Sequence, residues 1–166
     1  IMFNQVASTL GALIKGPEFP ESLEFPDTAL KEAVGSRTRL IVVINPNNPT
    51  GTIVDPKVIE DLLQTFQKHP LLVDEAYFEF TGQSSLELLA EHPNLIILRT
   101  FSKALALPGL RLGYLIAHPE LISHFQKIRG PYDVNAAAIA AARKQLENPK
   151  GWQFVVNHLM EEVKPI

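Results

Sequence analysis

The stretch LIILRTFSKALALPGLRLGY, residues 95–114, decides the fold predicted for this chain. Its first four residues are apolar, as is typical of a buried strand, and the polar segment RTFSK follows directly. In open α/β sheets, ligands bind beyond the carboxyl ends of the strands. Lys103 can attack a carbonyl carbon to give a Schiff base, and Arg111 offers a planar fork of donors that matches phosphate oxygens. This stretch indicates a ligand with an electrophilic carbon and a phosphate, although on its own it also fits an ordinary solvated strand exit.

Two further apolar runs end in polar clusters of the same kind. Residues 40–44, LIVVI, precede NPNNPTG at 45–51, and residues 71–73 precede DEAY at 74–77. Helical patterns separate these runs, and the fold class expected is therefore α/β, with a mostly parallel sheet and helices on both faces. Right-handed crossovers bring the carboxyl ends of parallel strands, and so the three polar clusters, to one edge. The expected helices span residues 1–10, 28–34, 55–66, 85–90, 119–128, 135–146 and 151–160, and a further strand spans 112–117.

Composition narrows the function classes. The chain has 166 residues, enough for one core of ordinary size, and a net charge of −3, which argues against nucleic-acid binding. It contains no cysteine, which excludes disulfides and thiolate metal sites and fits a cytoplasmic location. No apolar run is long enough to cross a bilayer, and no signal peptide is visible. The five histidines lack metal-ligand spacing, so no metal site is predicted.

Four motifs together carry a resemblance to a known family: VINPNNPTG, LLVDEAYFEF, LRTFSKALALPGLRLGY and IRGPYDVNAAA. The chain resembles the fold-type I pyridoxal-phosphate enzymes, the class I/II aminotransferases, and within them the histidinol-phosphate aminotransferases. The resemblance implies that residues 1–166 form the central part of the large, pyridoxal-phosphate-binding domain, without the preceding segment or the C-terminal small domain. An excised or partial chain is also expected because Ile1 is not an initiator methionine. The family usually forms homodimers.

The same resemblance implies roles for four residues of the third motif. Lys103 matches the family's Schiff-base lysine, which then acts as the base that moves the substrate α-proton. Arg111 would bind the cofactor phosphate, and Thr100 and Ser102 would add hydroxyl donors. The departure Asp133, where the family commonly has asparagine, does not touch these roles.

Residues of the first two motifs would surround the cofactor ring. Asp74 would pair with the pyridinium nitrogen, which keeps that nitrogen protonated. Tyr77 and Asn48 would bond the phenolic oxygen. Structural alternatives stay open for each: a turn residue for Asn48, a helix cap for Asp74 and a packing ring for Tyr77. Glu75 and Glu79 are expected to be solvated.

The function that follows from the resemblance is transfer of an amino group between an amino acid and a 2-oxo acid. The substrates expected are histidinol phosphate and imidazole acetol phosphate, with glutamate and 2-oxoglutarate as the second couple. One alternative is a decarboxylase of the same fold, such as a threonine-phosphate decarboxylase, because Lys103 and Asn48 do not decide which bond breaks. The other is a non-catalytic aminotransferase-like domain, against which the joint presence of Lys103, Asp74 and Arg111 argues.

Overall fold

The computed structural model describes residues 2–162, and the chain divides into two compact units between Thr38 and Arg39. The first unit contains helices α1 (Met2–Thr9) and α2 (Asp27–Ala33), joined by a connection that carries Pro17, Pro20 and Pro26. Proline lacks the amide donor that a helix or central strand needs, which explains why this connection stays irregular. All of the candidate site residues belong to the second unit.

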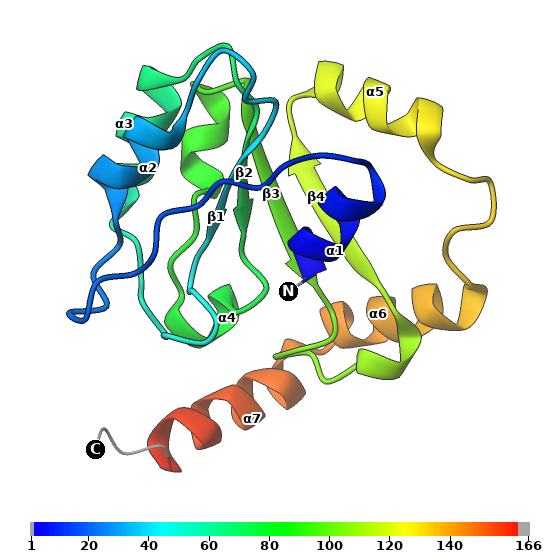
Figure 1. The fold of residues 1–166 in the computed structure, drawn as a ribbon. Coiled ribbons are helices and arrows are strands. Elements are labelled where there is room, and N and C mark those ends of the chain that lie inside the picture. Colours follow the sequence, from blue (N-terminus) through cyan, green and yellow to red (C-terminus); the bar gives the residue numbers. More distant parts are fainter. Residues whose placement is uncertain (1, 163–166) are drawn as a thin grey trace. The chain divides into compact units, whose positions relative to one another are not determined.

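The second unit is built on a four-stranded sheet in the order β1 (Ile41–Ile44), β2 (Leu71–Asp74), β3 (Leu95–Thr100) and β4 (Gly113–Ala117) (Figure 1). Strands β1, β2 and β3 are parallel, and their register aligns Ile44 with Asp74 and Asp74 with Leu98. The predicted mostly parallel α/β fold is confirmed. The polar clusters after these three strands therefore begin at the same edge of the sheet.

Strand β4 runs antiparallel to β3, with Leu98 opposite Leu115. Parallel neighbours are usually joined by a crossover helix that packs on the face of the sheet. The connection here, residues 101–112, contains only the short 3-10 helix η2 (Pro108–Leu110) and no such crossover helix. The chain turns back on itself, and this loop carries Lys103 and Arg111 at the carboxyl end of β3.

Most predicted helices form where the sequence indicates, and their caps explain why. Asp55 caps α3 (Pro56–Thr65) by accepting a hydrogen bond from the Lys57 amide at 2.8 Å. Asn135 caps α6 (Ala136–Glu147) in the same way, with 2.8 Å between its Oδ1 and the Ala138 amide nitrogen. The other helical elements of this unit are α4 (Phe78–Thr81), the 3-10 helix η1 (Leu86–Ala90), α5 (Pro119–Ile128) and α7 (Pro149–Glu162).

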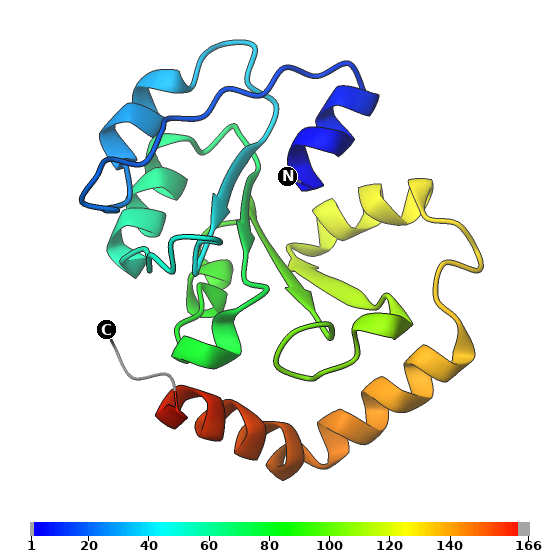
Figure 2. The same cartoon turned by 60° about the horizontal axis from the view of Figure 1, so that its bottom comes forward.

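Helices α6 and α7 follow one another at the end of the sheet where β1, β2 and β3 terminate (Figure 2). The apolar pattern of residues 151–160 predicts an inward face made of Trp152, Val155, Val156 and Leu159. This prediction is partly wrong for α7, because Val156 is buried but Val155 and Leu159 are each 46% exposed. Only one stripe of this helix packs against the rest of the unit. No helix among the described residues, 2–162, is both long and apolar enough to cross a membrane.

The main core lies between α3 and the sheet, and one substitution tests it. Leu62 on α3 is completely buried, so Leu62→Ala removes apolar contacts and leaves a cavity. We expect the free energy of unfolding, measured by urea denaturation of the full-length protein, to fall by about 3 kcal/mol. The matched control is Leu146→Ala on α6, where the side chain is 60% exposed and the expected loss is small. Equal losses in the two variants would contradict the assigned core.

Candidate functional site

Asp74 is the last residue of β2 and is buried, with 7% of its surface exposed. Its Oδ1 accepts a hydrogen bond from the Ala76 amide at 3.1 Å. Burial raises the pKa of this carboxyl above its usual range, and the Ala76 hydrogen bond opposes that rise only in part. A buried carboxylate with so little compensation favours a cationic or proton-bearing partner. The alternative of a helix cap is not seen, because the cap position of α4 is Tyr77.

Asn48 and Tyr77 come from different strand ends and meet directly, since Asn48 Nδ2 donates to Tyr77 Oη at 2.7 Å. The loop that carries Asn48 is fixed from both ends: the buried Asn45 Oδ1 accepts from the Val54 amide at 3.0 Å. The Tyr77 ring also packs against Phe80, with 6.3 Å between ring centroids, so it has a packing role as well. A surface depression beside this pair is lined by Pro46, Asn47, Asn48, Pro49, Gly51, Tyr77, Phe80 and Thr81.

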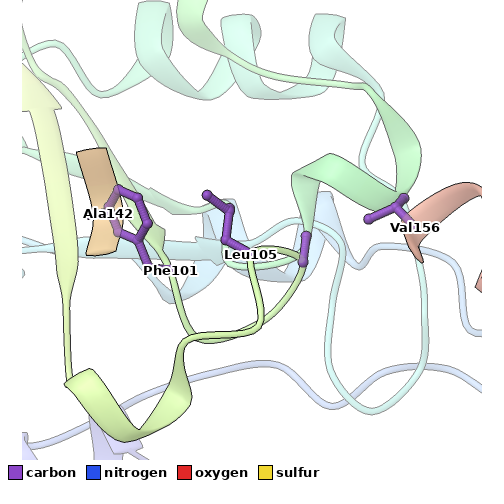
Figure 3. Close-up of a cluster of buried hydrophobic side chains, with 5 residues drawn as sticks. Phe101, Leu105, Ala142 and Val156 are labelled. Carbon is purple, nitrogen blue, oxygen red and sulfur yellow. The ribbon is translucent and has the colours of Figure 1, made fainter. Parts of the chain in front are cut away.

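Lys103 is exposed at the tip of a loop whose neighbouring residues are anchored. Phe101 and Leu105, on either side of the lysine, are buried in a cluster with Ala142 of α6 and Val156 of α7 (Figure 3). The Lys103 ammonium lies 5.1 Å from the centroid of the Tyr77 ring, a cation–π distance. The apolar anchors therefore hold the loop so that the Lys103 side chain lies over the ring of Tyr77, the tyrosine that bonds Asn48.

The hydroxyls and the arginine predicted to bind phosphate lie around the same loop. Thr100 Oγ1 accepts from the Ser102 amide at 3.1 Å and donates to the Leu112 carbonyl at 3.4 Å. Arg111 has the left-handed backbone conformation, with φ 52° and ψ 45°, and its exposed guanidinium donates to the Pro108 carbonyl at 3.2 Å. The structure thus brings Asn48, Tyr77 and Lys103 together and connects Thr100 to Ser102. Among the described residues, Arg111 contacts none of these by hydrogen bond.

The expectation that Glu75 is solvated is wrong. Glu75 is fully buried and forms an ion pair with Arg99, with 2.9 Å between Arg99 Nη2 and Glu75 Oε2. The two residues stand one position beyond the aligned pair Asp74 and Leu98, which places them on the same side of adjacent parallel strands. In the sequence, each of these charges directly follows a strand pattern: Glu75 comes after the run that ends in Asp74, and Arg99 comes after the apolar residues 95–98.

Glu79 is likewise not solvated but half-buried on α4. Burial is the main cause of the raised pKa of its carboxyl, while the Arg99 charge lowers this pKa and the Glu75 charge raises it. Its Oε2 is buried and has no hydrogen-bond partner among the described residues. Within that part of the chain, no cluster of three or more His, Cys, Asp or Glu residues is arranged to bind a metal ion.

The parallel strands, the buried Asp74 and the loop that carries Lys103 define an α/β domain with a candidate ligand site at the carboxyl edge of its sheet. Residues 22–164 match the family described as Aminotransferase class I and II. The chain therefore belongs to the class I and II aminotransferase family, as its motifs predicted.

Individual relatives and solved structures that are similar to this chain support its membership of the family. Histidinol-phosphate aminotransferase 1 of Carboxydothermus hydrogenoformans is 44% identical over 142 residues, which cover 85% of this chain and 40% of the relative. The solved histidinol-phosphate aminotransferase from Sinorhizobium meliloti, in complex with pyridoxal-5'-phosphate, is 26% identical with a TM-score of 0.80, covering 93% of this chain and 43% of that one. L-threonine-O-3-phosphate decarboxylase from Porphyromonas gingivalis is 25% identical with a TM-score of 0.79, covering 94% and 46%. The chain spans about 40% of the length of the curated relatives it matches.

Proposed function

We propose that this chain is part of an aminotransferase that uses pyridoxal 5'-phosphate. It would provide the lysine Lys103, the aspartate Asp74, and the pair Asn48 and Tyr77 that bonds the cofactor ring. One observation carries the proposal: Lys103, Tyr77 and Asn48 converge at the sheet edge where β2 ends in the buried Asp74. The chain's membership of the family and its similarity to a relative solved with this cofactor support it.

The residues present fit this cofactor chemically. The buried Asp74 carboxylate, with its raised pKa, suits a ring nitrogen that carries a proton. Asn48 and Tyr77 already share a 2.7 Å hydrogen bond and both carry donors that suit a phenolic oxygen. Arg111 and the hydroxyls of Thr100 and Ser102 suit a phosphate.

When bound, the cofactor supplies an electron sink that weakens bonds at the α-carbon of an amino acid. The protein's own residues then have separate tasks. Lys103 would hold the cofactor through its amine and carry the proton of the substrate α-carbon. Asp74 would keep the ring nitrogen protonated, and Arg111 would bind the phosphate, which keeps the ring in place whenever the lysine is free.

We infer that the substrates are histidinol phosphate and imidazole acetol phosphate, with glutamate and 2-oxoglutarate as the second couple. Curated relatives with 40–44% identity that carry the name histidinol-phosphate aminotransferase support this substrate pair. Decarboxylation of an amino acid phosphate is the second candidate, favoured by the similarity to the P. gingivalis decarboxylase. Both reactions require the same lysine and aspartate.

We further infer a cytoplasmic homodimer in which residues 1–166 form the central part of the large, cofactor-binding domain. The family resemblance and the cysteine-free composition support this organisation. Light scattering on the full-length protein measures the oligomeric state, and a stable monomer would contradict the dimer.

The experiment that tests the function is borohydride reduction of the full-length protein after incubation with pyridoxal phosphate, followed by peptide mass mapping. We expect a pyridoxyl group on the peptide that contains Lys103 and on no other lysine peptide. In a separate sample that has not been reduced, histidinol phosphate should convert the cofactor to its amine form with release of imidazole acetol phosphate. An unlabelled Lys103 would refute the site, whereas carbon dioxide release from an amino acid phosphate would select the decarboxylase.

A further inference from the structure

A buried polar network lies directly behind the proposed site and has no part in the function above. Arg99 is 9% exposed, and both its Nε and its Nη2 donate to Glu75 Oε2, at 3.0 and 2.9 Å. Arg99 Nη2 also donates to Ser84 Oγ at 2.7 Å. Glu75 Oε1 accepts from the amide of Ser85, so both carboxylate oxygens are satisfied. A buried ion pair whose guanidinium and both carboxylate oxygens are hydrogen-bonded fixes the geometry of the segments it joins.

The segments joined are those that carry the site. Glu75 directly follows Asp74, and its own amide donates to the Leu98 carbonyl at 2.8 Å, which extends the pairing of β2 with β3 by one residue. The Arg99 guanidinium carbon lies 3.7 Å from the centroid of the Phe78 ring, and Phe78 directly follows Tyr77. One guanidinium therefore contacts the residue after Asp74 and the residue after Tyr77.

Arg99 also begins the segment that leads to the lysine. It stands immediately before Thr100 and four positions before Lys103, on the last strand that is parallel to β2. Side chains alternate along a strand, so Arg99 points to the opposite side of the sheet from Thr100. The network therefore lies on the face of the sheet opposite Thr100 and does not occupy the site.

Stability alone does not account for the buried ion pair between Arg99 and Glu75. Replacing a buried ion pair by apolar side chains of similar volume is often neutral or stabilising, so such a pair is weak evidence for a stability role alone. The planar fork of Arg99, with two donors on one carboxylate and one face on a ring, instead specifies orientation.

We propose that Arg99 is a positioning residue that sets the orientation of Asp74 and Tyr77 toward the cofactor through Glu75 and Phe78. This inference rests on the proposed function. Its consequence is that the network controls the protonation of the bound cofactor. If Tyr77 and Asn48 lose their orientation, the phenolic oxygen of the cofactor loses hydrogen-bond donors. Its ionised form is then less stabilised, so the bound cofactor loses its proton at a higher pH.

The test compares Arg99→Lys with wild type in the full-length protein loaded with pyridoxal phosphate. Lysine keeps the charge that Glu75 needs but cannot make the forked contact and lie flat on Phe78. We expect the cofactor dissociation constant to rise about tenfold. We also expect the pH midpoint of the cofactor's visible absorbance to move upward by about half a unit or more.

Two further variants make the comparison decisive. Arg143→Lys is the matched control, because Arg143 forms an exposed ion pair with Glu147 on α6; it should leave the dissociation constant and the pH midpoint unchanged. If Arg99→Lys does not fold, Ser84→Ala takes its place, since it removes one hydroxyl from the network and leaves the ion pair; a smaller shift in the same direction is then expected.

Each outcome bears on one of the two proposals. A lower melting temperature of the cofactor-free variant with an unchanged pH midpoint and dissociation constant would show that Arg99 is only structural, which overturns the inference and leaves the function standing. Absence of borohydride labelling at Lys103 in the wild type would overturn the function, and the inference with it.

Discussion

Lys103→Ala is expected to abolish covalent attachment of pyridoxal phosphate and to lower the transamination rate by about four orders of magnitude. Alanine removes both the amine that would bind the cofactor and the base that would move the substrate α-proton. The fold should not change, because Lys103 is exposed while its neighbours Phe101 and Leu105 supply the buried contacts of the loop. Single-turnover rates and peptide mass mapping after reduction measure the two losses.

The control for this variant is Lys144→Ala, which removes an exposed lysine from α6. It should keep the wild-type rate and the label at Lys103. A label that moves to another lysine, or a Lys103→Ala rate within tenfold of wild type, would contradict the role assigned to Lys103.

Asp74→Asn is expected to lower the transamination rate by about a hundredfold to a thousandfold. The amide has nearly the same shape as the carboxylate but no charge, so it cannot favour a protonated ring nitrogen. The visible spectrum of the loaded variant should differ from wild type for the same reason. A variant that turns over at the wild-type rate would exclude Asp74 from the site.

The same variant has an opposite effect on the cofactor-free protein. Burial raises the pKa of Asp74 above its ordinary value of 3.8, so the ionised carboxylate costs stability at neutral pH. The contribution of this carboxyl to stability is fully present below pH 3.8 and is lost as the pH rises through the folded-state pKa. Cofactor-free Asp74→Asn should therefore melt at a higher temperature than wild type at pH 7.

Thermal melts of the cofactor-free proteins across the acid range check this sign. The advantage of Asp74→Asn should shrink as the pH falls toward the ordinary carboxyl range, because the wild-type side chain becomes neutral there. An advantage that grows toward acid pH would mean that the carboxylate is stabilised in the folded state. A site residue that destabilises the empty protein is expected where activity needs a buried charge.

The strand ends were predictable from the sequence because each is a short apolar run followed by residues that cannot continue it. Asn48 and Tyr77, 29 positions apart in the chain, meet as the convergence of strand ends implies. Proline at 56 and 119, with caps before them, also marked where α3 and α5 begin. These signals depend only on residues that are neighbours in the sequence, so they can be recognised without knowledge of the fold.

The features that the sequence did not reveal depend on contacts between distant segments. Glu75 looked like a surface residue because glutamate is seldom fully buried, and only the register of β2 with β3 shows its pairing with Arg99. The sequence did not decide which face of α7 packs inward, because this helix has more apolar residues than one packing stripe needs. In the structure Val156 is buried and Leu159 is not. Which apolar residue faces inward depends on the partner surface, which periodicity does not describe.

The anchoring of the lysine loop has a consequence for biosynthesis. Phe101 and Leu105 share their buried cluster with Ala142 and Val156, which the ribosome adds later. During translation the sheet can form before the loop that carries Lys103 has anything to rest on. We therefore expect the loop that carries Lys103 to reach its final position only after α7 has been synthesised, later than Asp74 and Tyr77 at the strand ends.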